Sequence, residues 1–276
     1  MRNGERSGAI KTRMLESALE RWIELGLTKR PRLLEIFSEG KNHHAGLIDV
    51  LGEKQVIKVF RHSIEPAVDA QQQAAEFDLA PKIYARHQNS VLMEFLDGSV
   101  PEIKQMADSL SILHSKSLAN RDGLDLRRYF DQYLQNSSEQ LKSKHQSLLP
   151  LLEEFFNDTT PWCFCHNDLV AENCIAWKSP AYFIDWEYAA QHNPWFDLAA
   201  VTLYRGLDTE QAKEFLRGYA GWQRKVEDRI FLISQITLLW SDLLWHIDRY
   251  GYDYQVTHQK RFSQLDSLVA QLGLHT

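Results

Sequence analysis

The sequence predicts an α+β protein of two lobes, a small strand-rich N-terminal lobe over residues 1–95 and a larger, mainly helical lobe over residues 96–276. Short β-rich segments separated by turn residues fill the first third of the chain. Apolar residues then recur at helical spacing through most of the remainder. The composition, 44% hydrophobic and 25% charged, is typical of a globular protein long enough to bury a substantial core.

The N-terminal lobe is expected to begin with a helix over residues 8–27, in which Ile10, Met14, Ala18 and Trp22 recur every four positions. Five strands and one further helix should follow, because strand-forming runs alternate with turn residues. The expected strands are 32–37, 47–51, 55–60, 82–86 and 90–95, and the expected helix is 66–77.

The C-terminal lobe is expected to consist mostly of helices, with a short strand-rich segment in its middle. The predicted helices are 100–114, 126–135, 138–157 with a break near Pro150, 194–205, 209–220, 227–250 and 255–272. The predicted strands are 162–165, 174–177 and 182–184. In the predicted helix 100–114, His114 falls on the apolar side, together with Ile103, Ala107 and Leu110.

Charge, hydropathy and cysteine usage exclude several classes. The net charge of −6 offers no basic surface for nucleic acid, so no such partner is expected. No apolar run reaches the roughly 20 residues that cross a bilayer, and residues 1–11 are polar, so neither membrane insertion nor a secretory signal is expected. The odd, clustered set Cys163, Cys165 and Cys174 favours a reducing cytoplasm. Zinc at Cys163–His166 is disfavoured, since structural zinc usually takes ligands from two knuckles. The oligomeric state is left open.

The most specific pattern is His166-Asn167-Asp168, followed by Asn173 and, after an apolar strand, by Asp185. Phosphoryl transfer needs a carboxylate beside the attacking hydroxyl and oxygen ligands that hold Mg²⁺ against the nucleotide phosphates. Asp168 is therefore predicted to accept or orient the hydroxyl, while Asn173 and Asp185 are predicted to hold Mg²⁺. Asp168 and Asn173 alone fit a plain turn as well, because both residue types are common turn formers. Asp185 at the right spacing makes the pattern much rarer.

Two further residues are interpreted through this pattern. His166 is predicted to hold the loop in shape by hydrogen bonds rather than to act as a base or a metal ligand. Lys58 lies in an apolar strand, where a kinase places the lysine that pairs with the α- and β-phosphates of ATP. The alternative is a lysine on the solvent face of the strand. The acidic or amide partner of Lys58 stays open among Glu65, Asp69, Glu76 and the glutamines 71–73.

The nucleotide is expected to meet a loop and a hinge as well. Gly40 and Gly46 bound a polar segment that would cover the phosphates, although the segment holds few glycines. His43 and His44 within it are either additional hydrogen-bond donors or solvated loop residues. The hinge positions expected to meet adenine through backbone groups are Glu94 and Leu96.

Aromatic residues of the late helix bear on the substrate. Trp240, Trp245 and Tyr250 follow one another at steps of five residues, which turns the rings to different faces, and such rings are more often core than ligand box. Carboxylates near one or two of the rings would nevertheless favour a cationic substrate. The residues predicted to bind substrate are Trp186, Glu187, Trp240 and Trp245, with Asp242 and Asp248 as further nearby acids.

These motifs resemble the choline kinase and aminoglycoside phosphotransferase family. The family's His-x-Asp-x-x-x-x-Asn loop is matched from His166 to Asn173, and its Ile-Asp-Trp-Glu-Tyr-Ala strand is matched over 184–189. Phe-Asp-Leu-Ala is matched over 196–199, the hinge form over 93–98, and Leu-Ala-Pro over 79–81. In such proteins the aspartate of Phe-Asp-Leu-Ala braces the catalytic loop, so the resemblance assigns that structural role to Asp197.

The resemblance implies a kinase-like bilobal fold and an ATP- and Mg²⁺-dependent kinase. Ile-Asp-Trp-Glu-Tyr-Ala and the tryptophan-bearing late helix look most like the choline, ethanolamine and thiamine kinase branch. The expected reaction is transfer of the γ-phosphoryl group to an alcohol of a small, cationic metabolite. One alternative is an aminoglycoside or sugar kinase of the same family, and another is a non-catalytic nucleotide-binding regulatory protein. The glycine-poor loop, and the lack of a clear glutamate on the helix after Lys58, depart from the family pattern and leave ATP versus GTP open.

Overall fold

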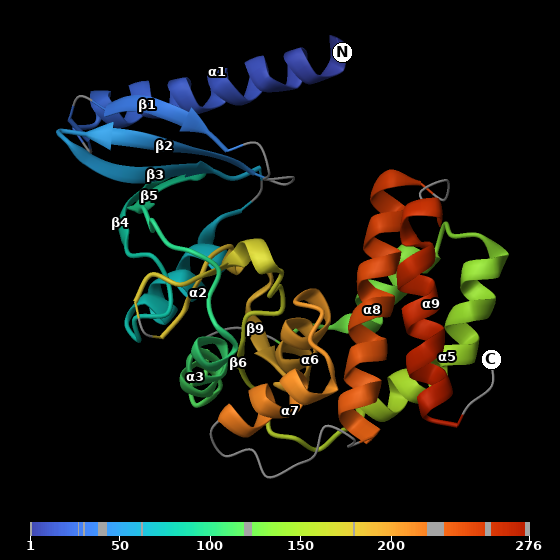
Figure 1. Cartoon of the computed structure of the whole chain (residues 1–276). Helices are drawn as coiled ribbons and strands as arrows, with labels where there is room; N and C mark the ends of the chain where they lie inside the picture. Colours follow the sequence, from blue (N-terminus) through green and yellow to red (C-terminus); the bar gives the residue numbers. More distant parts are fainter. Residues whose placement is uncertain are drawn as a thin grey trace. The chain divides into compact units, whose positions relative to one another are not determined.

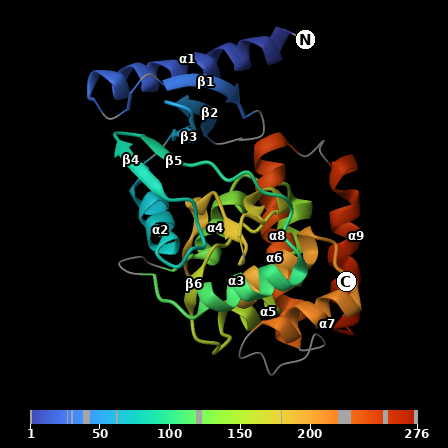
Figure 2. The same cartoon turned by 60° about the vertical axis from the view of Figure 1, so that its left-hand side comes forward.

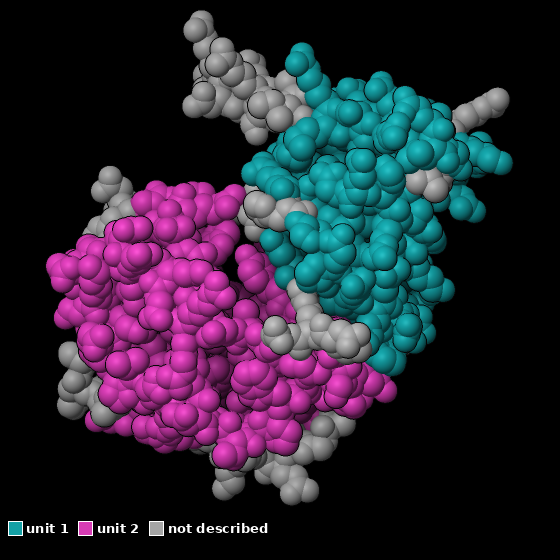
Figure 3. All heavy atoms as spheres, turned by 180° about the vertical axis from the view of Figure 1, so that it is seen from behind, with its two compact units in different colours: residues 1–100, 175–187 teal, residues 101–174, 188–276 magenta. Residues whose placement is uncertain are grey.

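The computed structural model describes residues 2–26, 28–29, 31–37, 43–61, 63–118, 123–178, 180–219, 229–251 and 255–273, with the side chains of 2–10 and 255–258 excepted. The chain divides into two compact units (Figure 3). Unit 1 contains residues 1–100 and 175–187, and unit 2 contains residues 101–174 and 188–276. The predicted lobes divided the chain near residue 95. The observed units differ chiefly because residues 175–187 group with the first.

Unit 1 is built on a five-stranded antiparallel sheet of order β1-β2-β3-β5-β4. Its strands are β1 (Pro31–Ile36), β2 (His44–Val50), β3 (Glu53–Val59), β4 (Ile83–His87) and β5 (Ser90–Glu94), close to the five expected ranges. The β2–β3 hairpin turns through Leu51 and Gly52, whose φ angles are 57° and 93°. Two successive positive φ angles are what a tight hairpin with right-handed strand twist requires.

Two helices cover this sheet (Figure 1). α1 (Arg2–Glu24) buries Leu15, Leu19 and Trp22 against β2, β3 and β5, and the Trp22 indole N–H donates to Ser90 Oγ at 2.8 Å. Burying one such side chain stabilises the fold by about 1.5–3 kcal/mol. The apolar residues that supply this free energy recur about every four positions because they share the buried face of the helix. α2 (Glu65–Ala75) packs against a second apolar cluster that includes Phe60.

Unit 2 is mainly helical (Figure 2). Its longest buried helix is α8. Its helices are α3 (Ile103–His114), α4 (Leu126–Leu134), α5 (Glu139–Phe156), α6 (Trp195–Tyr204), α7 (Thr209–Gly218), α8 (Arg229–Tyr250) and α9 (Gln255–Gln271). α4, α5, α6 and α9 all contact α8. By length and composition α8 would suit a membrane span, but 72% of its most apolar window is buried inside the protein, as expected of a core helix.

One helix prediction is wrong. α5 continues through Pro150, where a break was expected. Proline removes one hydrogen bond and crowds the preceding turn. Leu148, Leu151, Leu152 and Phe155 are nevertheless buried on both sides of it, so packing of the continuous apolar face outweighs the local cost.

Short elements connect the helices in the middle of the chain. They are β6 (Cys163–Cys165), η1 (Ala171–Asn173), β7 (Cys174–Ile175), β8 (Tyr182–Phe183), η2 (Trp186–Tyr188) and β9 (Ala190–His192). β6 pairs with β9 and β7 pairs with β8. β9 was not predicted, because three residues that include Gln191 and His192 carry no readable apolar alternation. It supplies the partner that the buried strand β6 needs.

Candidate functional site

The predicted catalytic loop of unit 2 closes on itself. β6 leads directly into His166, whose Nδ1 accepts a hydrogen bond from the backbone N–H of Asp168 at 3.2 Å. The side-chain amide of Asn173 donates to the Asp168 carbonyl oxygen at 2.9 Å and to its Oδ2 at 3.0 Å. Since the amide nitrogen of Asn173 is used in this way, its amide oxygen is the atom suited to bind a cation.

Asp197 of α6 braces this loop through hydrogen bonds to its backbone. Its Oδ2 accepts the backbone N–H of His166 at 2.8 Å and its Oδ1 accepts that of Asn167 at 2.7 Å. His114 of α3 places Nε2 at 3.1 Å from the same Oδ2, and its Nδ1 lies 2.8 Å from the Tyr219 hydroxyl. The Asp197 side chain is fully buried, so the surrounding donors are what make its charge tolerable.

The two buried ionisable groups shift each other's pKa. Burial alone would raise the pKa of Asp197, but the hydrogen bond and charge of His114, with the His166 interactions, hold that pKa below its usual value. Burial alone would lower the pKa of His114, yet Asp197 and the neighbouring Cys163 raise it. Both shifts favour the charged pair.

Asn167 adopts an unusual backbone conformation next to the predicted base. Its φ is 66°, in the left-handed region that asparagine tolerates better than most residues. Its side chain donates to the Tyr188 carbonyl oxygen at 3.0 Å and accepts from His192 Nδ1 at 2.8 Å. Burial lowers the pKa of His192 to about 4, so the ring is neutral at pH 7. These side-chain bonds fix the turn that presents Asp168.

Sequence reasoning missed the bracing roles of His114, His192 and Tyr219. For His114 a signal was present, because an ionisable residue on the apolar side of a helix needs a buried partner. His192 and Tyr219 carried no comparable signal, since their partners lie far away in the sequence.

Unit 1 carries the other predicted residues. Lys58 Nζ of β3 lies 2.9 Å from Asp185 Oδ1, and the ammonium group is 4.8 Å from the centre of the Phe60 ring. Asp185 was not among the residues considered as partners of Lys58 in the sequence. Asp69 of α2 pairs with Arg86, and Gln71 donates to the Pro81 carbonyl oxygen.

Close backbone contacts hold the segment that carries Asp185 to unit 1. The Ala176 N–H donates to the Ser99 carbonyl oxygen at 2.8 Å, and the Phe183 N–H donates to that of Leu79 at 2.7 Å. A Cβ on Gly98 would lie 2.5 Å from the Ala176 oxygen, so only glycine fits there. Asp185 itself has φ 66°, a strained conformation that this scaffold maintains.

Glu187 pairs with His43, the residue directly before β2. Its Oε2 lies 3.2 Å from His43 Nε2, and the imidazole packs 4.7 Å from the Phe60 ring. His43, Asp185 and Glu187 bring one ligand atom each within 4.8 Å of one another. His43 Nδ1 accepts the Arg61 N–H, however, so in the neutral ring Nε2 carries the proton and cannot bind a metal. The carboxylate oxygens of Asp185 and Glu187 remain, and these suit Mg²⁺.

Two predicted substrate residues are core residues instead. Trp186 is 1% exposed and donates to the Phe183 carbonyl oxygen, and Trp240 is 0% exposed and donates to His145 Nδ1. Neither ring is accessible to a ligand in this structure. Trp245 is only partly buried, and the Arg249 guanidinium lies 5.4 Å from its ring centre.

The predicted nucleotide loop and hinge need one correction. Gly46 lies inside the sheet, paired with Ile36 and Ile57, and a Cβ there would meet the Glu35 oxygen at 2.9 Å. It therefore serves strand packing rather than phosphate contact. Gly40 lies outside the described residues.

The hinge segment follows β5. The backbone N–H of Glu94 donates to the Lys82 carbonyl oxygen at 2.9 Å, so it is engaged within unit 1. Leu96 as a whole residue is 8% exposed, so it is buried in this structure.

A group of His114, Cys163 and Cys165 in unit 2 resembles a metal site by proximity alone. Both ring nitrogens of His114 are already bonded, to Tyr219 and Asp197, and the two thiol sulfurs lie 3.6 Å apart. Structural zinc takes four ligands, and the part of the chain that the structure describes brings only these three together here, so the group does not fit zinc.

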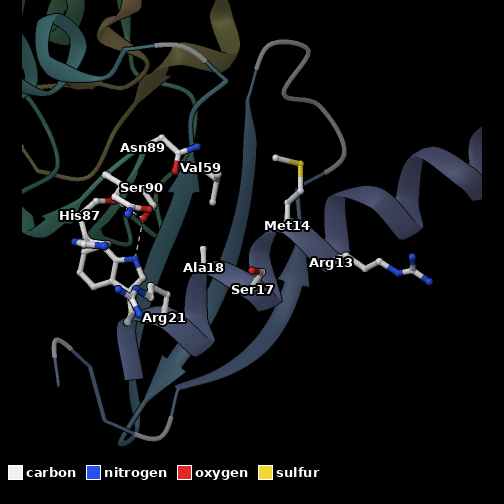
Figure 4. A pocket seen from close by; sticks show the side chains of 11 residues that line it. Arg13, Met14, Ser17, Ala18, Arg21, Val59, His87, Asn89 and Ser90 are labelled. Atoms are coloured by element: carbon white, nitrogen blue, oxygen red, sulfur yellow. Dashed lines mark hydrogen bonds between the residues drawn. The ribbon is translucent and has the colours of Figure 1, made fainter. Parts of the chain in front are cut away.

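Unit 1 also has a cavity of about 460 Å³ between α1 and the β4–β5 turn (Figure 4). The residues that line it are Arg13, Met14, Ser17, Ala18, Arg21, Trp22, Val59, His87, Gln88, Asn89 and Ser90. None of the predicted site residues is among them, so this cavity is separate from the chemistry considered above.

Comparison with known proteins identifies the family. Residues 51–226 match the phosphotransferase enzyme family. The chain belongs to this family. As a phosphotransferase it is similar to a LicA homologue of Mycoplasma capricolum, with 28% identity over 177 residues, covering 60% of this chain and 72% of the relative.

Solved structures confirm the kinase-like α+β fold expected for a family member. Choline kinase LicA from Streptococcus pneumoniae superposes with a TM-score of 0.73 at 20% identity, covering 93% of this chain and 99% of that chain. An aminoglycoside phosphotransferase, a thermostable mutant of APH(4)-Ia in ternary complex with ADP and hygromycin B, gives 0.68 at 14% identity. The match covers 89% of the present chain and 95% of the APH(4)-Ia chain.

Proposed function

We propose that this phosphotransferase transfers the γ-phosphoryl group of ATP to the hydroxyl of a small alcohol that carries a positive charge, of the choline, ethanolamine or thiamine type. The observation that carries the proposal is the loop in which Asn173 is bonded to Asp168 while buried Asp197 fixes the preceding backbone. A loop that only turned the chain would not need a buried carboxylate beneath it.

Asp168 is the residue that orients the acceptor hydroxyl and accepts its proton as the phosphoryl group transfers. The Asn173 bond to Oδ2 restrains the carboxylate to one orientation, and the neighbouring left-handed Asn167 sets the direction in which it points. Orientation of this kind is the main contribution that a protein makes to phosphoryl transfer, since the reaction involves little covalent participation by the enzyme.

Lys58, Asp185 and Asn173 are proposed to hold the nucleotide phosphates and Mg²⁺. Asn173 of unit 2 would supply an amide oxygen, and Asp185 of unit 1, with Glu187 near it, would supply carboxylate oxygens. Oxygen ligands of this kind suit Mg²⁺. When bound, this ion neutralises charge on the β- and γ-phosphates. Lys58 now pairs with Asp185 and would turn its ammonium group to the phosphates.

Adenine is proposed to meet the backbone that follows β5. Because the Glu94 N–H is engaged by Lys82, Glu94 would contribute its carbonyl oxygen and Leu96 its N–H. This donor and acceptor pair matches the amino group and ring nitrogen of adenine. The nucleotide complex of the structural neighbour supports a nucleotide here. The three free cysteines support the proposed cytoplasmic location.

The test is ADP production with Mg·ATP over a panel of ethanolamine, choline, thiamine, simple sugars and kanamycin. Asp168→Ala should lower kcat by about 10²–10⁴-fold, the usual size of a general-base contribution, while leaving calorimetric ATP binding unchanged. Turnover on one cationic alcohol supports the proposal, and turnover only on a sugar or kanamycin supports the aminoglycoside alternative. ATP binding without turnover on any alcohol would favour a regulatory protein.

A further inference from the structure

Two thiols of unit 2 lie side by side immediately before the catalytic loop. Cys163 and Cys165 are the first and last residues of β6, so their side chains leave the same face of the strand. Their sulfur atoms are 3.6 Å apart and share a hydrogen bond. Cys165 is fully buried, whereas Cys163 is 8% exposed, so of the two Cys163 is the thiol open to a small solute.

The surroundings give the two thiols different reactivity. One ring nitrogen of His114 and the two sulfur atoms all lie within 4.8 Å of one another. The hydrogen bond from Cys165 and the positive charge of His114 hold the pKa of Cys163 below its ordinary value, against the effect of burial. Burial and the neighbouring Cys163 raise the pKa of Cys165. Because the thiolate is the nucleophilic form of cysteine, Cys163 is the residue that an oxidant attacks first.

A disulfide between these two residues is within reach but would be strained. Two residues of an extended strand advance the chain by about 6.6 Å. This spacing lies near the upper end of the roughly 4.4–6.8 Å that separates the Cα atoms of bonded cysteines. The strand must therefore shorten between Cys163 and Cys165 for the bond to form. A strained disulfide is easily reduced, and in a reducing compartment such bonds are transient and regulatory.

We propose that Cys163 and Cys165 form an oxidation site, at which hydrogen peroxide closes a reversible disulfide that displaces the catalytic loop. The Cys163 thiolate attacks one peroxide oxygen, the O–O bond breaks, and the hydroxide that leaves takes up the proton that Cys163 had released. This step gives a sulfenic acid at Cys163. The Cys165 thiol then attacks that sulfur, and the S–O bond breaks as the S–S bond forms. The hydroxyl leaves as water with the Cys165 proton, so the thiols lose two electrons and peroxide becomes two molecules of water.

The bond would act on the catalytic loop through β6 and β9. Cys163 pairs with His192 of β9, and the Cys165 thiol donates to the His192 carbonyl oxygen at 3.4 Å. The His192 ring in turn donates to Asn167 Oδ1 at 2.8 Å, one of the contacts that fix the turn before Asp168. Shortening β6 removes the Cys165 bond to His192 and moves the strand that leads directly into the loop. Only the resulting loss of activity rests on the proposed function, since the bond itself forms without any substrate.

The first experiment follows the bond itself by mass spectrometry. The folded protein is treated with hydrogen peroxide and then unfolded in denaturant, where the remaining thiols are alkylated and peptides are mapped. We expect the peptide that contains Cys163 and Cys165 to lose the mass of two hydrogen atoms and to resist alkylation until dithiothreitol is added. Recovery of both residues as alkylated thiols, or a sulfinic acid at Cys163 as the first product, would overturn the inference.

Three variants assign the roles of the individual thiols. Cys163→Ala should form neither the sulfenic acid nor the disulfide, and Cys165→Ala should stop at a sulfenic acid that dimedone labels. Cys174→Ala is the matched control, because burial raises the pKa of Cys174 to about 12 and makes it a poor nucleophile. This variant should form the disulfide as the unchanged protein does. Thermal unfolding of each variant establishes that it is folded.

Activity and amide exchange then test the effect on the loop. We expect kcat to fall about 10²-fold in the oxidised protein, the cost of misplacing a catalytic group by ~1 Å, and to recover with dithiothreitol. The backbone amides of His166 and Asn167, which donate to Asp197, should exchange faster with deuterium after oxidation. Faster exchange supports the inference even if no alcohol is phosphorylated, in which case only the proposed function fails. A disulfide that leaves both exchange and kcat unchanged overturns the inference and leaves the proposed function standing.

Discussion

Charged pairs at the candidate sites of the two units are held in opposite ways. In unit 2, Asp197 and His114 form a pair whose side chains are 0% and 2% exposed, and they fix the loop before any ligand arrives. In unit 1, Lys58 and Asp185 form a pair whose side chains are 13% and 36% exposed. A buried pair rigidifies because neither partner has another place to satisfy its charge. An accessible pair can open, which suits groups that must exchange one partner for a nucleotide.

The largest effect expected from the difference between the buried and the accessible pair is that of Asp197→Ala. It leaves His114 buried without its counter-ion and frees the His166 and Asn167 N–H groups, so we expect the free energy of unfolding to fall by about 3–5 kcal/mol. Urea unfolding measures this. Asp69→Ala, which breaks the exposed pair with Arg86, is the matched control and should change stability by about 1 kcal/mol or less. A similar small loss for Asp197→Ala would show that the buried pair does not brace the loop.

A second test uses pH. The folded-state pKa of His114 is raised above its ordinary 6.5, so its stabilising effect is fully present below 6.5 and is lost as pH rises through the raised value. The pKa of Asp197 is lowered from 3.8, so its contribution is present above 3.8 and is lost as pH falls through the lowered value.

The pH effect is isolated by comparing the protein with His114→Gln, since every other ionisable group is common to both. The stability difference should shrink as pH rises above 6.5, by at most about 1.4 kcal/mol per pH unit for one proton. Urea unfolding at several pH values gives this difference. A difference that is constant with pH, or grows, would contradict a charged His114.

The smallest expected effect on stability is that of Lys58→Met. Because the Lys58–Asp185 pair is partly exposed, its loss should change the free energy of unfolding by about 1 kcal/mol or less. Phosphoryl transfer should nevertheless be severely reduced, since the phosphates lose their proposed partner. Chemical unfolding and ADP production measure the two effects in one preparation. A large loss of stability would show that the Lys58–Asp185 pair stabilises the fold as the buried pair does, which would contradict the contrast drawn between the two pairs.

Local spacing was enough to predict much of this protein. The five strands of unit 1 and the helices of unit 2 followed from periods of two and of about 3.6, which reflect how side chains leave each backbone. The loop from His166 to Asn173 was readable because its hydrogen bonds join residues within five positions. Asp197 was readable only through family resemblance, since its bonds to the loop cross about 30 positions.

The sequence by itself determined the helices, the strands and the His-x-Asp-x-x-x-x-Asn loop, because those depend on neighbours along the chain. Tertiary structure decided that Lys58 pairs with Asp185, 127 positions away, and that Trp240 fills the core instead of a substrate pocket. It also carried α5 through Pro150. In each case the deciding free energy comes from burial and charge pairing between distant segments, and no local period records which distant segment that will be.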